Sequence, residues 1–366
     1  MKLALIEPSK TGVEHISFNR AVAHGLQAAS GNEMRLYCSS SQFNAMSVDM
    51  PWTCLPVVSI TRRAFFRKSL VELLALTGSM LHARAHGFRD VMLLSIFTPL
   101  LGTLPLLARL SGTRVTVVLH GELDGLLDAR RMKITSYGYW VKRFFEKKGF
   151  EKVNCVVLSK GIQQRLAELY PDCAAHTVAI DHPMEITPLK AIPRDITFAT
   201  LGIATMERFE ALYAGLAALP PSQRPGLHHI GMCEPAVFEQ FKDVVTFSCR
   251  PGDSLSPQDY EAMAARVSHA LVLYDPSEYQ LRVSGAMIDA LRTGARLIAY
   301  PCGYAKDLQD EGFDVTLVPD LGALMQLLTQ TVPPAADRDA HSDTANLAQQ
   351  AYSGRKFAER LLRVLA

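Results

Sequence analysis

The chain has 366 residues, of which 48% are hydrophobic and 20% are charged, and its formal net charge is +2. A chain of this length and composition is expected to fold into about two globular domains, which excludes fibrous and disordered proteins. The balanced charge argues against a dedicated nucleic-acid binder, which needs a strongly basic surface.

The cysteines and the first residues indicate the compartment. The seven cysteines form no CxxC pair, and an odd number does not suit a secreted disulfide framework. The opening MKLALIEPSK has too short an apolar run for a secretion signal, and no apolar stretch long enough to span a bilayer is free of prolines. We therefore expect a cytoplasmic protein with reduced thiols.

Short apolar runs alternate with helical patterns through the first half of the chain. This alternation is typical of a parallel sheet covered by helices on both faces. The predicted strands are Lys2–Ile6 and residues 34–38, 91–96, 114–119 and 153–158. The predicted helices are residues 15–28, 63–85, 100–110, 137–148 and 161–169.

The same alternation starts again after a segment with three prolines, residues 181–195, which has no periodicity. The predicted strands are residues 196–201, 227–231, 244–247, 270–274, 296–299 and 315–318. The predicted helices are residues 206–218, 257–265, 285–293, 321–328 and 346–365. The pattern predicts an α/β protein with a doubly wound domain over residues 1–184, a linker over 185–195 and a second doubly wound domain over 196–340. We expect a central cleft between the two domains, and a C-terminal helical segment, residues 341–366, that packs back on the first domain.

The segment from Tyr274 to Tyr300 has the composition of an anion-binding turn. Ser284 and Gly285 open a predicted helix, where free backbone N–H groups and the helix dipole favour a phosphate. Asp289 lies one turn inside, where a carboxylate can accept ribose hydroxyls, and Arg282 precedes the turn. An ordinary N-capped helix with an exposed aspartate is the alternative.

This segment resembles the donor-binding motif of the GT-B glycosyltransferases of group 1, the family of glycogen synthase and sucrose synthase. The family pattern E-G-F-G-L-P-x-x-E-A-x-x-x-G falls on LRVSGAMIDALRTG. The resemblance implies that the amides of Ser284, Gly285 and Ala286 hold the diphosphate and that Asp289 holds the ribose. The first glutamate of the family, which approaches the donor sugar, falls on Leu281. Glu278, three residues earlier, is the candidate substitute for it.

A second resemblance opens the second half, where TFATLGIATMERFEAL is similar to the family's F-x-G-R-x-x-x-x-K-G. Gly202 matches the glycine, and Arg208 falls at the phosphate-binding lysine. Ile203 replaces the family's arginine, so the resemblance implies that Arg282 supplies the second cation. A solvated helix charge is the alternative for Arg208.

Two first-half segments also resemble segments of the family. The stretch EPSKTGVEHISFNR is similar to its glycine-bearing loop, which implies that Gly12 and His15 lie near the acceptor. His120 ends a predicted inner strand, where a histidine of the family faces the donor sugar. Glu122 and Asp124 follow in the same loop and are the candidate general bases of an inverting enzyme. Surface or capping histidines are the alternative.

Basic residues interleaved with aromatics form two further stretches. Arg62, Arg63, Arg67 and Lys68 lie beside Phe65 and Phe66, and eight Lys or Arg lie between Arg130 and Lys152. The second stretch includes Lys142, Arg143, Lys147 and Lys148. Such stretches are typical of helices on an anionic membrane surface. A solvated basic face with its aromatics in the core is the alternative.

Together these features predict a GT-B glycosyltransferase in two Rossmann-like domains. It would move a sugar from a nucleotide-sugar, UDP favoured over GDP, to a glycan acceptor, and the expected acceptor is lipid-linked, in bacterial surface polysaccharide synthesis. We expect no cofactor and no metal, retention of configuration, a monomer or weak dimer, and attachment to the inner face of the cell membrane. The alternatives are a non-catalytic partner protein of the same fold and a nucleotide-sugar epimerase.

Overall fold

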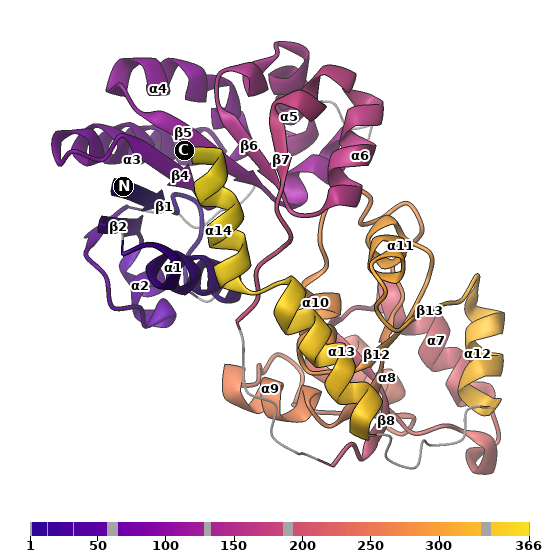
Figure 1. Cartoon of the computed structure of the whole chain (residues 1–366). Helices are drawn as coiled ribbons and strands as arrows, with labels where there is room; N and C mark the ends of the chain where they lie inside the picture. The colour runs from indigo at the N-terminus through magenta and orange to yellow at the C-terminus, as the bar shows by residue number, and fades with distance from the viewer. Residues whose placement is uncertain are drawn as a thin grey trace. The chain divides into compact units, whose positions relative to one another are not determined.

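The computed structural model arranges the chain in two units (Figure 1). The N-terminal unit comprises Met1–Glu185, Gln280–Val283 and Ala351–Ala366, and the C-terminal unit comprises Ile186–Tyr279 and Ser284–Gln350. The structure describes residues 2–12, 14–31, 33–56, 65–127, 133–185, 193–330 and 338–365.

The N-terminal unit is built on a seven-stranded sheet in which every pairing is parallel. Its strands lie in the order β3-β2-β1-β4-β5-β6-β7. Their bounds are β1 Lys2–Ile6, β2 Glu33–Cys38, β3 Trp52–Cys54, β4 Asp90–Leu93, β5 Arg114–Leu119, β6 Asn154–Val157 and β7 Thr177–Ala179.

Helices cover both faces of this sheet. They are α1 Ile16–Ser30, α2 Ser40–Met46, α3 Phe65–Ala85, α4 Leu104–Ser111, α5 Tyr137–Glu146, α6 Lys160–Leu169 and the C-terminal α14 Gly354–Leu365. Short 3-10 helices span Thr98–Thr103, Gly121–Leu126, Gly149–Glu151 and Pro171–Ala175.

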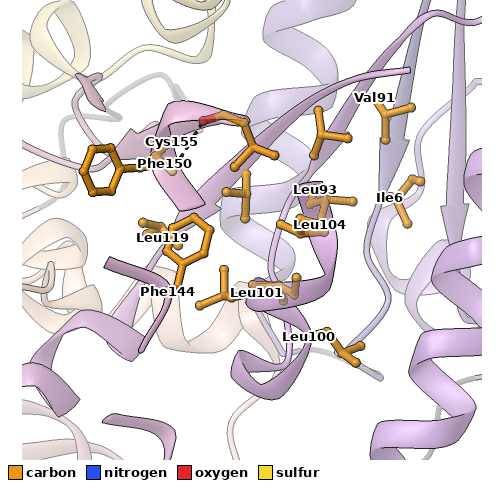
Figure 2. Close-up of a cluster of buried hydrophobic side chains, with 14 of the residues drawn as sticks. Ile6, Val91, Leu93, Leu100, Leu101, Leu104, Leu119, Phe144, Phe150 and Cys155 are labelled. Atoms are coloured by element: carbon orange, nitrogen blue, oxygen red, sulfur yellow. Dashed lines mark hydrogen bonds between the residues drawn. The ribbon is translucent and has the colours of Figure 1, made fainter. Parts of the chain in front are cut away.

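The alternation of side chains along β1 produces two cores. Ala4 and Ile6 point into a core with α3, α4, α5 and α6, whereas Leu3 and Leu5 point into a second core with α1 and α14. Figure 2 shows part of the first core, with Ile6 and Leu101 among its side chains. Both faces of the strand are buried, which is why the strands of this sheet are continuous apolar runs in the sequence.

The C-terminal unit has a six-stranded sheet, again with parallel pairings only, in the order β10-β9-β8-β11-β12-β13. The strands are β8 Ile196–Ala204, β9 Leu227–Cys233, β10 Val245–Phe247, β11 Val267–Val272, β12 Arg296–Ala299 and β13 Val315–Leu317. The helices are α7 Met206–Ala218, α8 Pro235–Phe241, α9 Pro257–Ala264, α10 Gly285–Arg292, α11 Gly303–Asp310, α12 Leu321–Gln330 and α13 Arg338–Ala351, with a 3-10 turn at Pro221–Gln223.

Both sheets reverse their strand order at one point. The reversal falls between β1 and β4 in the N-terminal unit and between β8 and β11 in the C-terminal unit. Where the order reverses, the loops that leave neighbouring strands diverge to opposite faces and open a crevice outside the carboxyl ends. Each unit therefore has one place where a ligand site is expected.

The C-terminal helix α14 packs against α1 through small residues, and Figure 1 shows the two helices side by side. Gly354 approaches α1 so closely that an added Cβ would overlap the carbonyl oxygen of Ala21. The amide of Met184 donates to the carbonyl of Tyr352 at 2.7 Å, just before the helix. The end of the chain is thus part of the N-terminal unit.

The structure corrects several predicted elements. The strand predicted over 91–96 ends at Leu93, and the helix predicted over 100–110 is a 3-10 helix followed by α4. The single last helix predicted over 346–365 is two helices, because Tyr352 and Ser353 leave the helix to pair with Met184. The elements α2, β3, β7, α8 and α11 were not predicted; each is eight residues or shorter, too short for a clear periodic pattern.

We predict that Gly354→Ala destabilises the protein by about 1–3 kcal/mol, because the new methyl group forces α1 and α14 apart. Urea unfolding followed by circular dichroism measures the change. Gly78→Ala is the matched control: an added Cβ on this α3 glycine meets no atom within 4 Å, so the unfolding midpoint should stay or rise. Equal midpoints for Gly354→Ala and the native protein would contradict the close approach.

Candidate functional site

A cavity of about 470 Å³ lies at the reversal point of the N-terminal sheet. The loops that follow β1, β4 and β5 line it, together with α3 and the start of α5. Its lining includes Lys10, Glu14, His15, Lys68, Thr98, His120, Glu122, Tyr137 and Arg282. Thr98 Oγ1 and His15 Nδ1 are buried and lack a hydrogen-bond partner among the residues that the structure describes. Unused polar groups of this kind are available to a polar ligand.

Three histidines cluster beside this cavity. The ring of His120 lies 4.8 Å from that of His15 and 6.5 Å from that of His182, measured between centroids, and Phe18 packs on His120 at 4.5 Å. Burial lowers the pKa of His15 to about 3 and that of His182 to about 4, and it lowers the pKa of His120 well below its ordinary value. All three imidazoles are therefore neutral at neutral pH.

The hydrogen bonds of His120 define its tautomer. Its Nε2 lies 2.9 Å from the carbonyl oxygen of Leu94. A carbonyl oxygen can only accept, so Nε2 carries the proton and Nδ1 is the basic nitrogen. The backbone N–H of His120 also donates to Glu122 Oε2 at 2.7 Å, which ties the two predicted catalytic residues together. Burial raises the pKa of Glu122.

Two further carboxylates near the cavity were missed in the sequence. Glu7, at the end of β1, is fully buried and accepts hydrogen bonds from Ser95 and from Asn19, and burial raises its pKa. Glu72 of α3 pairs with Lys68 at 2.9 Å. The sequence feature that could have identified Glu7 is its position directly after a predicted inner strand.

Lys68 differs from its predicted role. The sequence places it in a basic surface stretch, but its side chain is buried, paired with Glu72, and its Nζ lies 5.2 Å from the centre of the Phe97 ring. The pairing is favourable because a lysine buried without a counter-charge carries a large desolvation cost. Lys68 thus lines the cavity from the inner face of α3.

Asp124, a candidate base, has an anchoring role. One of its oxygens accepts the backbone N–H of Leu281 at 2.8 Å, and the other lies 2.7 Å from Arg282 Nε. Leu281 is buried in the core of the N-terminal unit, so the position of the family's first glutamate is a packing residue here. Arg282, predicted to bind the donor, lines the N-terminal cavity.

The predicted acceptor loop begins directly after β1. Gly12 has a left-handed backbone with φ of 57°, and its amide donates to Ser41 Oγ at 3.1 Å. His15 also has a positive φ, 56°, and immediately precedes α1. The structure therefore brings His15 and His120 together, while Gly12 shapes the turn that leads to them.

In the C-terminal unit, predicted donor residues meet at the reversal point. The guanidinium of Arg208 lies 4.6 Å from the centre of the Tyr274 ring, and its Nη2 lies 3.5 Å from Glu278 Oε1. Gly202 has φ of 101° near the end of β8, a conformation that favours glycine. Ile203, at the family's arginine, is 57% exposed.

The start of α10 has the predicted cap. Ser284 Oγ accepts the amide of Met287 at 3.3 Å and donates to the Tyr274 hydroxyl at 3.1 Å. Gly285 is exposed, and Ala286 is half-buried beside it. Ser284 caps the Met287 amide, so the N–H groups of Gly285 and Ala286 are the ones in this first turn that can receive an anion.

Asp289 lies one turn further along α10. The Tyr260 hydroxyl donates to its Oδ2 at 3.3 Å, and Arg292 Nη2 lies 3.9 Å from its Oδ1. Burial raises the pKa of Asp289, and Arg292 and Tyr260 oppose that shift. These contacts hold the carboxylate in place.

The basic residues predicted for a membrane surface are exposed on and just after α5. Lys142, Arg143, Lys147 and Lys148 are all exposed, and Lys148 pairs with Asp172 at 2.8 Å. Of the aromatic residues in this stretch, Phe144, Phe145 and Phe150 are buried in the core, whereas Tyr139 and Trp140 are half-buried and Tyr137 is exposed. The helix thus has features of both the membrane-surface prediction and its alternative, a solvated basic face. Arg62 and Arg63 lie outside the described residues.

Among the residues that the structure describes, no three His, Cys, Asp or Glu side chains are grouped so as to hold a metal ion. None of the described helices combines the length and the apolar character that crossing a bilayer requires.

The structure resembles solved glycosyltransferase structures over its whole length. Anabaena Alr3699/HepE in complex with UDP matches with a TM-score of 0.68 and 13% identity, covering 100% of this chain and 99% of that one. Sucrose-phosphate synthase from Thermosynechococcus elongatus matches with a TM-score of 0.65 and 16% identity, covering 100% and 98%. The lipopolysaccharide outer core galactosyltransferase WaaB matches with a TM-score of 0.62 and 13% identity, covering 100% and 99%.

These similarities establish the fold. The chain has the GT-B fold, with two parallel-sheet α/β domains like those of the glycosyltransferases above. No protein-family model matches the chain, and no curated protein matches its sequence.

We predict that the imidazole signals of His15, His120 and His182 stay at their neutral positions from about pH 8 to about pH 5, because burial disfavours their charged forms. NMR of protein labelled at histidine Cε1 measures this, with His→Gln variants to assign each signal. In the urea-unfolded chain the same signals should titrate near about pH 6.5. The unfolded state then binds more protons, so these histidines lower stability as pH falls below that value. A midpoint above about pH 6 for any of the three in the folded protein would contradict the burial argument.

Proposed function

We propose that the protein is a glycosyltransferase that moves a sugar from a UDP-sugar to a glycan acceptor without a metal ion. The observation that carries the proposal comes from the C-terminal unit, whose strand order reverses between β8 and β11. The first turn of α10, Asp289 and Arg208 all belong to this unit. The GT-B fold supports it, and HepE, which has this fold, was crystallised with UDP.

The donor would bind through α10. The amides after Ser284 would receive the diphosphate, since an anion at a helix N-terminus interacts favourably with free N–H groups and the helix dipole. Asp289 would accept the ribose hydroxyls. Arg208, held over Tyr274, would stabilise the charge that develops on the leaving diphosphate. Glu278 pairs with Arg208 and would approach the donor sugar.

The acceptor would bind in the N-terminal cavity. Its polar lining suits a sugar hydroxyl, and His120 Nδ1 and Glu122 are its best proton acceptors, because Asp124 is engaged with Arg282 and Leu281. The resemblance to group 1 enzymes favours retention of configuration. Glu122 as a general base belongs to the inverting alternative, which the turnover of the Glu122→Gln variant decides. We further propose that the acceptor is a lipid-linked glycan of surface polysaccharide synthesis, which the similarity to WaaB supports.

The donor assignment predicts that Asp289→Ala weakens UDP binding by about 10- to 100-fold, because two hydrogen bonds to a charged group are lost. Isothermal titration calorimetry without metal measures the dissociation constant. Asp314→Asn is the matched control. It removes one negative charge from the amino-terminal ends of the strands of the same sheet, where Asp314 pairs with Arg296 at 2.9 Å. It should leave UDP affinity unchanged. Equal UDP affinity for Asp289→Ala and the native protein would remove Asp289 from the donor site.

The acid–base assignment predicts that Glu122→Gln lowers the rate of UDP-glucose turnover by about 10²- to 10⁴-fold while UDP affinity stays unchanged. Glutamine keeps an oxygen that can accept the His120 amide, so the loop should keep its shape. Glu14→Gln, an exposed residue of the same cavity, is the control and should keep the native rate. Chromatography of the products separates transfer or hydrolysis from epimerisation. A native rate for Glu122→Gln would show that Glu122 handles no proton in the reaction.

A further inference from the structure

Helix α3 presents an apolar face to solvent. Phe66 is 75% exposed, Leu70 59%, Leu74 64% and Leu81 50%. At about 100° per residue these four side chains fall within an arc of about 80°, so they form one stripe about 22 Å long. The opposite face holds Lys68 and packs into the unit. An exposed helix face ordinarily carries polar residues, so this stripe lacks the usual solvent-facing composition.

Helix α4 extends the stripe into a surface. It packs against α3, on the same face of the sheet (Figure 1), and exposes Leu106 at 58% and Leu110 at 69%. Six of the thirteen exposed large hydrophobic residues of the described chain thus lie on two neighbouring helices. We call these six residues, Phe66, Leu70, Leu74, Leu81, Leu106 and Leu110, the α3–α4 surface. A concentration of this kind marks an interaction site.

The charges around the α3–α4 surface all have one sign. Residues 65–114 contain two carboxylates, Glu72 and Asp90, and both are buried. The charged side chains that reach solvent in this stretch are arginines, namely Arg67, Arg84, Arg89 and Arg109, together with Arg114, whose charge is balanced by Asp90 at 2.7 Å. The partner of this surface must therefore offer apolar groups together with negative charge.

We propose that the α3–α4 surface docks on an anionic lipid bilayer. The leucine and phenylalanine side chains would enter the region between headgroups and acyl chains, and the arginines would contact lipid phosphates. A second copy of the chain fits less well, because a two-fold interface through this surface would bring arginines of one copy against those of the other. A bilayer meets both requirements, the apolar interior and the negative charge.

The same helix connects this surface to the cavity. Phe66 points outward from α3, whereas Lys68, two residues later, lines the cavity on the inner side. A bilayer on the outer face of α3 would lie one helix away from the cavity. An acceptor with a lipid tail could then remain in the bilayer while its polar head enters the cavity. This last step rests on the proposed function.

The test is flotation of the full-length protein with vesicles of phosphatidylcholine and phosphatidylglycerol, against vesicles of phosphatidylcholine alone. The native protein should float with the anionic vesicles. The double variant Leu70→Gln/Leu74→Gln should lower the partition coefficient by about tenfold or more, because two apolar side chains no longer enter the interface. The charge variant Arg67→Glu/Arg109→Glu should remove the preference for anionic vesicles.

The matched control is Leu169→Gln/Leu347→Gln, which changes two exposed leucines on α6 and α13 and should float like the native protein. Circular dichroism and UDP calorimetry of each variant separate this proposal from the proposed function. If the native protein floats with the vesicles but does not bind UDP, the donor site is contradicted and the docking proposal is not. Equal flotation of the native protein and Leu70→Gln/Leu74→Gln, or no flotation of the native protein, would overturn the proposal. So would a native dimer that this variant converts to a monomer, which would assign the surface to a second copy.

Discussion

The parallel direction of the strands is the constraint on which both candidate sites depend. All strands of a parallel sheet end at the same edge, so the polar residues that follow them gather there without being neighbours in sequence. In the N-terminal unit, the ends of β1, β4 and β5 bring His15, Thr98 and His120 to one cavity. In the C-terminal unit, the same rule puts Arg208, which follows β8, against Tyr274, which follows β11.

Burial at this edge determines which groups carry charge. In the N-terminal cavity it keeps the imidazoles neutral and raises the pKa of Glu7 and Glu122, so this side of the protein is rich in groups that can exchange protons. The C-terminal site differs, because a guanidinium and the start of a helix supply positive charge there. Under the proposed function, these two chemistries would correspond to the two halves of a transfer reaction, in which one partner loses a proton and the other leaves as an anion.

Helix α3 shows how one element can serve two environments. Its inner face has the buried Lys68–Glu72 pair, and its outer face is apolar and exposed. This reverses the usual distribution, in which charge faces water and apolar residues face the core. The reversal is consistent with a protein whose polar ligand lies inside the unit and whose apolar partner lies outside it.

The sequence by itself determined the features that depend on neighbours along the chain. The sheets follow from apolar runs between turns, the cap at Ser284 follows from its place before a helical pattern, and His120 stands where an inner strand ends. Tertiary structure alone decided which surface each side chain meets. Lys68 and Phe144 belong to basic, aromatic stretches that could equally lie on the surface, and only the packing of α3 and α5 buries them. Leu281 and Arg282 lie in the middle of the second half, yet the hydrogen bond and ion pair of Asp124 hold them in the N-terminal unit. Such contacts join residues more than 150 positions apart, so local propensity and residue spacing cannot predict them.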